Sequence, residues 1–540
     1  MKKLKRVSII LVLVMLVVVS IPGCSQKKDS QTSGNTSGTT AKETAATEAV
    51  SKEPVKFIIF NNSGGGTGAG SEAGSTKESY KAVQDYILGK TNVLIEVIKP
   101  PSNESEKKLA AMLSSGEQLD LWWGNWTDYY SDGIIQPLND VISKYGPNIK
   151  SVWEKWDAWG RVTDYNGKIW GIPRYTQFVS YFPFVRQDWL KKVNMEVPKT
   201  FKEFEDYLYA IKKLDPYGKG ETIPLIARGG KLDASLEMAL LGGFTKYGAS
   251  KWLDKDGNVM PKELQEGYSE FIATLAKWYK DGIIHNENFS WNAAKVRDYI
   301  GSGRVGASVA YYTDVSQFTA TMQKNFPDSD FVHYEKGMIG NNGELVQTLN
   351  AGSSKQMVIS SRVDEKRLPE LIKVIDWSFA SWENYQVCTS GIEDIHWKYD
   401  TSVVDKKTAV EQKVVTKIPN TGYYSDFCLS IGLPFESMGV IYDTNGKRNK
   451  HNLYLAEYLD DFNTCKMTVD ANITYDKKAL SENIPSLTAI ETTINEELVK
   501  FVTGERTMST WDDFVQSLYK NGLNDWIKEH TRQYKLLTGK

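Results

Sequence analysis

The sequence predicts an α/β protein whose folded body divides into two lobes. Runs of strand-forming residues alternate with amphipathic helical patterns from Val55 onward, an order typical of a lobe built on a largely parallel sheet. The body from Val55 to Lys540 is also too long to fold around one hydrophobic core. Together these two observations predict at least two α/β lobes.

The first part of the body shows the alternation clearly. The run Val55–Phe60 predicts a strand, and Ser75 and Glu78 form a capping box that opens a helix expected to end at Gly89. A strand, a helix and another strand are expected next, over residues 91–99, Ser105–Ser115 and 119–123.

Later segments continue the pattern. Residues 164–170 carry an Asn-Gly pair and predict a hairpin. Residues 198–203 open a second capped helix, whose apolar stripe includes Phe204, Leu208 and Ile211. Three further elements are expected, namely a helix ending at Gly282, a strand within residues 300–310 and the amphipathic helix Leu368–Phe379.

The N-terminus predicts export and a lipid anchor. Four basic residues precede the apolar stretch 7–21. That stretch is shorter than the ~20 apolar residues needed to cross a membrane, so a signal peptide over residues 1–23 is the better interpretation. Cys24 follows Gly23 and resembles the lipobox cysteine of bacterial lipoproteins, which implies cleavage before Cys24 and a thioether to diacylglycerol, with palmitate as a further acyl chain. A plain secretory signal with an incidental cysteine is the alternative.

Residues 24–54 are expected to form a disordered tether. Ser, Thr, Gly, Lys and Glu dominate this stretch, and its few apolar side chains cannot offset the entropy cost of ordering it. A flexible coil of this length spans roughly 30 Å on average. A folded body could therefore move above a membrane while it stays attached.

Charge, cysteine and motif content argue against several functions. Without residues 1–23, the 65 basic residues fall to 61 against 67 acidic ones, which gives a net charge of −6 and no sign of nucleic-acid binding. At most one disulfide can form among Cys388, Cys428 and Cys465, and their spacing fits no zinc site. Neither a G-x-S-x-G elbow nor an H-E-x-x-H motif is present, so we expect no enzyme.

Several short motifs follow one another in a characteristic order. They are WWGN at 122–125, GIIQPL at 133–138, YNGK at 165–168 with GIP at 171–173, RQDWL at 186–190, VPKTF at 197–201 and GSGRVGA at 301–307. Their shared order resembles that of the family 1 extracellular solute-binding proteins of ABC importers. That family includes the maltodextrin-binding proteins and larger, alginate-binding lipoproteins.

This resemblance implies a two-lobed clamp of the periplasmic-binding-protein type II kind, with a ligand cleft between the lobes that closes by a hinge motion. The expected lobes are residues 55–178 with 352–400, and residues 179–351 with 401–540. The resemblance also implies a monomer that is lipid-anchored on the outer face of the cell membrane and delivers its solute to ABC permease subunits.

The aromatic content favours a carbohydrate, specifically an oligosaccharide, as the ligand. The chain has 16 Trp, 28 Tyr and 19 Phe, and aromatic planes pack against the C–H faces of sugar rings. We expect Trp123 rather than Trp122 to face the cleft, because neighbouring strand residues point to opposite sides. The residues expected to line the cleft are Asn61, Asn62, Trp123, Asn125, Trp126, Arg174, Tyr175, Trp291, Asn292, Tyr311, Tyr312, Asp314, Glu393, His396 and Trp397. A peptide or other polar solute, and an adhesin without a transport role, are the alternatives.

The stretch LDPYGKGETIPL at residues 214–225 is similar to the calcium loop of the alginate-binding branch. Such a loop needs oxygen ligands at alternate positions, a glycine at position six and a carboxylate at position twelve. Counted from Asp215, position six is Gly220, but position five is Lys219 and position twelve is Ile226. We therefore expect no cofactor and no calcium, and a simple turn from Asp215 to Glu221.

Overall fold

The computed structural model describes residues 53–62, 74–101, 104–174, 178–179, 181–227, 232–311, 314–333, 338–346, 348–350, 355–402, 404–411, 413–430, 440–441 and 468–540. The expected signal peptide, Cys24 and nearly all of the expected tether lie outside these residues, as do Tyr175, Tyr312 and Cys465. Among the described helices, none is long and apolar enough to cross a membrane.

The first lobe is built on a four-stranded sheet in the order β12–β3–β1–β2. β1 (Val55–Phe60) pairs in parallel with β2 (Val93–Ile98) and β3 (Leu121–Gly124), whereas β12 (Gln356–Ile359) runs antiparallel to β3. The three parallel strands confirm the predicted alternation. Because β12 comes from much later in the chain, this lobe is assembled from separate segments of the sequence.

Helix α1 (Lys77–Thr91) differs from the prediction at both ends. Thr76 rather than Ser75 is the N-cap, and its hydroxyl accepts a hydrogen bond from the backbone N–H of Ser79. The helix continues past Gly89 because Asn92 adopts the left-handed cap conformation, with φ at 54°, and its N–H reaches the carbonyl of Leu88. Asparagine tolerates this conformation, so the expected glycine stop is not needed.

The second lobe is built on a sheet in the order β10–β5–β9–β6. β5 (Tyr181–Arg186) runs antiparallel to both β10 (Phe331–His333) and β9 (Val305–Tyr311), and β6 (Ile223–Ala227) is parallel to β9. Other helices of the body are α2 (Ser105–Ser115), α3 (Asn139–Tyr145), α4 (Pro147–Lys155), α5 (Gln187–Lys192), α8 (Tyr268–Lys280), α9 (Ala293–Gly301), α10 (Asp314–Gln323), α11 (Leu368–Phe379) and α12 (Trp382–Thr389).

Helix α6 (Phe201–Leu214) confirms the predicted capping box. The Thr200 hydroxyl accepts from the N–H of Glu203 at 3.1 Å, and the Glu203 carboxylate accepts from the N–H of Thr200 at 3.0 Å. The apolar stripe of α6 is buried, and Tyr207 within it donates to the carbonyl of Gly306 at 2.9 Å. The helix therefore packs against the sheet at β9.

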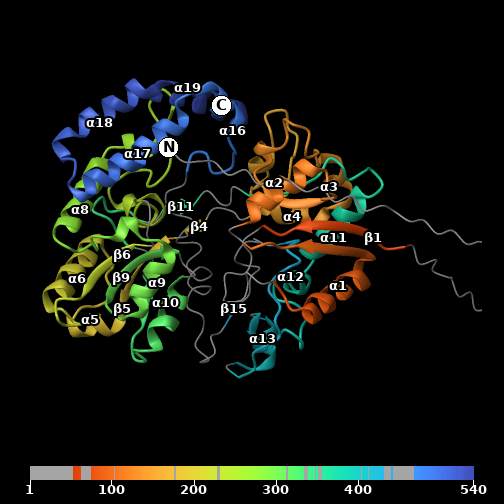
Figure 1. Cartoon of the computed structure of the whole chain (residues 1–540), viewed down its shortest axis with the longest axis horizontal. Coiled ribbons are helices and arrows are strands. Elements are labelled where there is room, and N and C mark those ends of the chain that lie inside the picture. The colour runs from red at the N-terminus through yellow and green to blue at the C-terminus, as the bar shows by residue number, and fades with distance from the viewer. Residues whose placement is uncertain are drawn as a thin grey trace, which may run out of the picture. The chain divides into compact units, whose positions relative to one another are not determined.

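The chain passes between the two sheets along a pair of short strands. β4 (Phe178–Val179) and β11 (Leu349–Asn350) are antiparallel neighbours, as Figure 1 shows. In the sequence, β4 comes after β3 of the first sheet and before β5 of the second. β11 comes after β10 of the second sheet and before β12, which belongs to the first sheet. The outgoing and returning segments are thus joined by hydrogen bonds at the crossing.

The segment after β12 stays with the first lobe for longer than expected. β13 (Trp397–Tyr399) and β14 (Val414–Lys417) pair in a small sheet, and Phe427 lies in the same buried cluster as β1 and β3. We expected residues 401–540 in the second lobe, but residues 414–429 contribute to the first core. Tyr423 donates to the carbonyl of Cys388 in α12, and the Trp123 indole of β3 donates to Cys428 Sγ.

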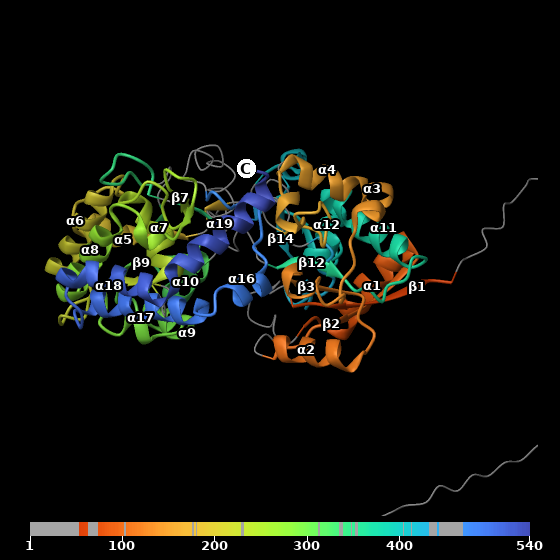
Figure 2. The same ribbon diagram turned by 90° about the horizontal axis from the view of Figure 1, so that it is seen from above.

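The C-terminal helices belong to the second lobe. They are α16 (Lys477–Asn483), α17 (Leu487–Thr503), α18 (Trp511–Leu518) and α19 (Asn524–Thr538), and Figures 1 and 2 show α17 near α8. α17 packs against α8, and α16 contacts both α19 and the short turn Trp126–Asp128 that follows β3. The end of the chain therefore touches both lobes.

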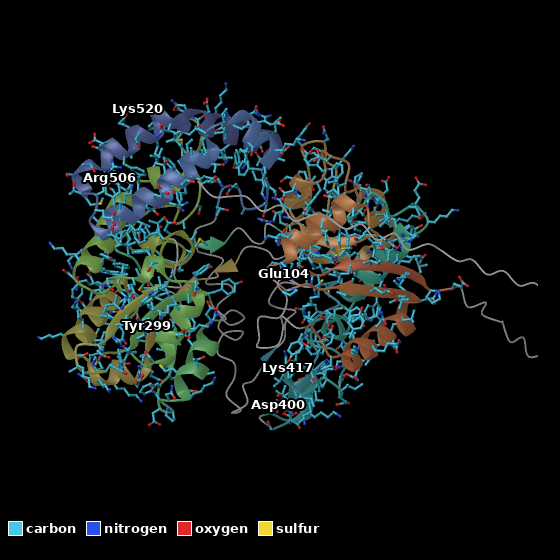
Figure 3. The ribbon with its side chains drawn as sticks, viewed as in Figure 1. Glu104, Tyr299, Asp400, Lys417, Arg506 and Lys520 are labelled. Carbon is cyan, nitrogen blue, oxygen red and sulfur yellow. The ribbon has the colours of Figure 1, made fainter. Side chains whose placement is uncertain are left out.

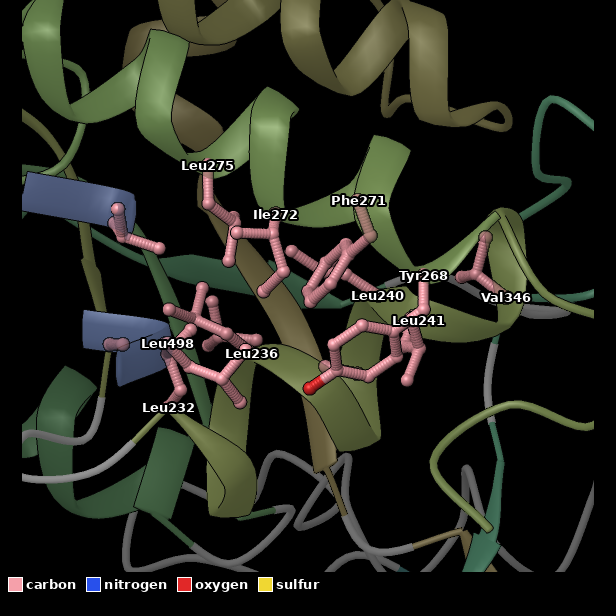
Figure 4. Close-up of a cluster of buried hydrophobic side chains, with 14 of the residues drawn as sticks. Leu232, Leu236, Leu240, Leu241, Tyr268, Phe271, Ile272, Leu275, Val346 and Leu498 are labelled. Atoms are coloured by element: carbon pink, nitrogen blue, oxygen red, sulfur yellow. The ribbon is translucent and has the colours of Figure 1, made fainter. Parts of the chain in front are cut away.

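The core of the second lobe joins three stretches that are far apart in the sequence. Leu240 ends the short helix α7 (Met238–Leu240) and Leu241 begins the 3-10 segment after it, while Phe271 and Leu275 come from α8 and Leu498 from α17 (Figure 4). All of them are 3% exposed or less. This packing fixes α17 to the lobe.

We expect Leu498→Ala to lower the free energy of unfolding by about 2–5 kcal/mol, because it removes buried methyl groups and leaves a cavity. Leu536→Ala serves as the control, since Leu536 is 48% exposed and its truncation should change stability by less than about 0.5 kcal/mol. Urea unfolding measures both. Equal effects of the two substitutions would contradict the packing of α17 in the core.

Candidate functional site

A pocket of about 520 Å³ with a mixed polar and apolar wall is lined by residues of both lobes. Its size lies within the range of ligand pockets, roughly 300–1,000 Å³. The first lobe contributes Asn125 and Arg161, and the second contributes residues between 238 and 263 together with Trp526. The remaining wall is residues 468–480. Its polar lining residues are Asn125, Arg161, Ser250, Lys251, Lys262, Glu263, Thr468, Asp470, Thr474, Tyr475 and Lys477.

Asn125 is held in a fixed orientation at the end of β3. Its Oδ1 accepts from the backbone N–H of Thr127 at 3.2 Å and from the Thr127 hydroxyl at 3.1 Å. The side chain is 6% exposed. Within the described part of the chain, its Nδ2 amide group has no hydrogen-bond partner, so two N–H donors are presented at the pocket wall.

Residues 470–476 form a strap between the two lobes. On the side of the first lobe, Arg161 donates from Nη1 to the carbonyl of Ala471, and its own carbonyl accepts from the Thr474 hydroxyl at 2.7 Å. On the side of the second lobe, Asp470 forms an ion pair with Lys251 at 3.0 Å. The strap is therefore attached to both lobes by buried polar contacts.

Gly160 permits the strap to approach the first lobe this closely. A Cβ built at residue 160 would lie 2.3 Å from the carbonyl oxygen of Asn472, which leaves no room for any side chain. Tyr130 adds a further attachment, since its hydroxyl donates to Asp476 at 2.5 Å.

Burial and neighbouring charges set the pKa values of Asp470 in the strap and of Arg161, which contacts the strap. Burial acts to raise the pKa of Asp470, but the Lys251 ammonium and nearby hydrogen bonds hold that pKa below its usual value. Burial also lowers the pKa of the Arg161 guanidinium to about 10, so it remains a cation at neutral pH. Both groups are ionised in the pocket wall.

Two carboxyl groups share one ammonium on the side of the second lobe. Lys262 Nζ lies 2.7 Å from Glu237 Oε2 and 3.6 Å from Glu263 Oε1. The Tyr268 hydroxyl donates to the other oxygen of Glu237. Burial raises the pKa of Glu263, the charge of Lys262 opposes this shift and the charge of Glu237 adds to it. Of the two carboxyl groups, Glu263 is the one that lines the pocket.

An aromatic pair supports the pocket from α19. Trp526 lines the pocket, and the His530 ring stacks on it with the centroids 3.7 Å apart. Burial and the charge of Lys251 lower the pKa of His530 to about 4. In the neutral ring, Nδ1 carries the proton and donates it to the carbonyl oxygen of Trp526 in a hydrogen bond of 2.9 Å.

The sequence-predicted residues near β3 form a buried network in which Asn125 alone reaches the pocket. Asn62 exchanges two hydrogen bonds with the backbone of Trp123, at 2.7 and 3.0 Å, and Asn61 donates to the carbonyls of residues 425 and 426. Trp123 is 1% exposed and donates to Cys428 Sγ, and Arg174 lies 5.2 Å from its ring. Trp122 is equally buried but lies in a different apolar cluster, as expected for neighbouring strand residues.

Trp126 directly follows Asn125 and begins the short turn Trp126–Asp128. It is 2% exposed and donates from Nε1 to the carbonyl of Arg161 at 2.9 Å. Its ring lies at a second, smaller pocket beside α19. Through this hydrogen bond, Trp126 helps to hold the backbone of Arg161 in place.

The predicted residues of the second lobe lie at α9 and α10. Trp291 is 8% exposed and stacks on Tyr299, seen among the helices of this lobe in Figure 3, with the centroids 4.3 Å apart. Asn292 is the N-cap of α9, and the Asp314 carboxylate accepts from the N–H of Tyr311 at 3.2 Å. None of these four predicted residues lines the described pocket.

The predicted segment 393–397 folds on itself beside the first core. The Trp397 indole donates to the carbonyl of Gly391, and Nδ1 of His396 accepts from the N–H of Ile392 at 2.9 Å. His396 and Trp397 are buried and Glu393 is exposed. This segment also lies outside the described pocket lining.

The loop after α6 is closed by its own aspartate. Asp215 accepts from the N–H groups of Gly220 at 2.6 Å and Thr222 at 3.1 Å. Hydrogen bonds to Thr222 and Gly220 lower the pKa of this carboxyl. Across the described ranges, no group of three or more potential metal ligands comes together.

Residues that sequence reasoning missed make up most of the pocket. Lys251, Glu263, Asp470 and Tyr475 follow no motif, and the last two lie beyond the region in which the ordered motifs occur. A charged pair such as Lys251 and Asp470, separated by more than 200 positions, leaves no local signal. Only the three-dimensional structure brings these residues together.

Two α/β lobes, joined by paired crossing strands and sharing one pocket, define a two-lobed solute-binding protein. The model of the bacterial extracellular solute-binding protein family matches residues 81–368, which is more than half of the chain. The protein belongs to this family, whose members are solute-binding proteins and not enzymes.

Known proteins agree with this assignment. The chain is 23% identical over 473 residues to the lipoprotein LipO of Bacillus subtilis, covering 85% of this chain and 88% of LipO. FusA of Streptococcus pneumoniae in complex with kestose superposes with a TM-score of 0.61 at 17% identity, over 90% of this chain and 99% of FusA. The alginate-binding protein AlgQ2 without calcium ion gives 0.59 at 19% identity, over 89% and 98%. These likenesses confirm the predicted α/β two-lobed fold.

We expect acid to destabilise the protein through His530. The folded pKa of about 4 lies below the ordinary value of 6.5, so the unfolded chain takes up a proton first as the pH falls. The contribution of the neutral His530 ring to the free energy of unfolding is fully present above pH 6.5. It is lost between pH 6.5 and 4, by roughly 3 kcal/mol at about 1.4 kcal/mol per pKa unit. Urea unfolding at pH 7.0 and 4.0 should show a correspondingly smaller loss in His530→Gln. The same loss in both proteins would contradict the buried neutral ring.

Proposed function

We propose that this protein is the lipid-anchored substrate-binding component of an ABC importer, which captures an oligosaccharide between its lobes and delivers it to a membrane permease. The observation that carries the proposal is the shared pocket. Asn125 and Arg161 belong to the first lobe, and Lys251 and Glu263 belong to the second. A solute that contacts both walls favours the closed arrangement, because it binds that state better than an open one.

The chemistry of the pocket wall suits a carbohydrate. Amide, ammonium, guanidinium and carboxyl groups line it, and Tyr475 and Trp526 supply aromatic surface. Sugar hydroxyls both donate and accept hydrogen bonds, and sugar C–H faces pack on aromatic rings. The relatives support the same ligand class, since FusA is named for fructooligosaccharide and AlgQ2 for alginate.

The proposed location follows from the N-terminal sequence and the family. A lipid at Cys24 and the polar residues up to 54 would hold the body at the outer face of the cell membrane, within reach of permease subunits. A monomer suffices for this role, because both walls of the pocket come from one chain. A peptide or other polar solute is the alternative ligand, and the binding outcomes below distinguish it from a saccharide. An adhesin without a transport role is the alternative function.

We expect Asn125→Asp to weaken oligosaccharide binding about tenfold, because it keeps the oxygen that accepts from Thr127 and removes the N–H donors at the pocket wall. Asn292→Asp is the matched control, since Asn292 is also an N-cap asparagine and lies outside the described pocket lining. Calorimetry on the full chain in detergent, with kestose, maltotriose and trigalacturonate as probes, measures both.

Two results would contradict the proposal. Binding of peptides with no binding of any saccharide would replace the ligand class. Equal affinities of the two variants for a saccharide that does bind would move the site away from this pocket.

A further inference from the structure

We propose that the pocket selects neutral oligosaccharides and discriminates against those that carry uronate groups, and that Glu263 sets this preference. The inference rests on the proposed function, because it assumes that the pocket binds a saccharide. It adds the charge of the ligand, which neither the family nor the fold decides.

The three lysine ammonium groups of the wall are each paired with a carboxylate of this chain. Lys251 lies 3.0 Å from Asp470, Lys262 lies 2.7 Å from Glu237, and Lys477 lies 3.3 Å from Asp128. The first two carboxylates are buried, at 8% and 0% exposure. A uronate that recruited one of these ammonium groups would leave a buried carboxylate without its cation, which is strongly unfavourable.

Arg161 is also engaged by the strap. It donates from Nη1 to the carbonyl of Ala471, and the charge of Asp470 acts on it. A ligand carboxylate that drew Arg161 away would break this contact between the strap and the first lobe. The guanidinium therefore serves the pocket wall rather than a ligand anion.

Glu263 presents an acceptor that a carboxylate ligand cannot satisfy. Its carboxyl is 7% exposed, lines the pocket, and has its ion-pair contact with Lys262 at the longer distance of 3.6 Å. A carboxylate offers about four lone-pair sites, so this contact leaves capacity for a ligand donor. A sugar hydroxyl supplies that donor, whereas the ionised carboxylate group of a uronate has none and brings a like charge into a poorly solvated site.

Asn125 completes the pattern from the other lobe. Its Nδ2 is a donor, and its Oδ1 is occupied by Thr127. A hydroxyl-bearing ring can accept from Asn125 and donate to Glu263, and so connect the two lobes. This pairing of one donor and one acceptor across the pocket matches a neutral sugar.

The native full chain in detergent tests the preference directly by calorimetry at pH 7.5. The neutral probes are kestose, maltotriose and fully methyl-esterified trigalacturonate, and the acidic probes are trigalacturonate and triguluronate. The methyl ester and trigalacturonate share ring and linkage, so they differ in charge. At least one neutral probe should bind, and each uronate should bind tenfold or more weakly than the tightest neutral probe.

Glu263→Gln assigns the preference to one side chain, and Glu266→Gln is the control because residue 266 is exposed three positions away. Glu263→Gln should raise uronate affinity relative to the neutral probes by about tenfold, and the control should leave the ratio unchanged.

A uronate that binds the native protein as tightly as any neutral probe overturns the inference and leaves the proposed function standing. An unchanged ratio in a folded Glu263→Gln protein removes Glu263 from the role. If no saccharide binds, the proposed function fails together with the inference. The native panel is decisive even if the variant does not fold.

Discussion

The attachment of residues 470–476 to both lobes is the constraint on which the pocket depends. Arg161 of the first lobe donates to the carbonyl of Ala471 in the strap, and Lys251 of the second lobe forms an ion pair with Asp470. Gly160 allows the close approach that makes the first contact possible. Without this strap, Asn125 and Glu263 would not border the same space. The pocket is therefore a product of three distant stretches of the chain.

The buried charges serve geometry more than stability. Taking an ion pair such as Lys251–Asp470 out of water costs about as much as the attraction returns, so such pairs contribute little net stability. Their effect is to orient the groups around them, because removal of either partner would leave a buried charge. The Lys262 ammonium, held close to Glu237, acts in the same way and leaves Glu263 at the pocket wall.

Local sequence rules predicted the fold better than the site. The capping box at Thr200 and Glu203 and the parallel strands β1, β2 and β3 were predictable because hydrogen-bonding and apolar patterns act over a few residues. The end of α1 was not, because Asn92 took the role expected of Gly89. The lobe boundary also shifted, since burial of Phe427 in the first core depends on contacts that are distant in sequence.

The candidate site shows the same limit from the other side. Asn125 was predictable because it directly follows a parallel strand, where open α/β sheets hold ligands. Trp123 and Trp291 were also expected at the cleft, yet both rings are buried against neighbouring side chains. Asp470 and Glu263 had no motif to mark them. The most direct measurement is a crystal structure of the protein with its tightest-binding neutral oligosaccharide. We predict one saccharide within hydrogen-bond distance of both Asn125 Nδ2 and the Glu263 carboxyl. A saccharide bound elsewhere, or held by one lobe alone, would contradict a pocket shared between the lobes.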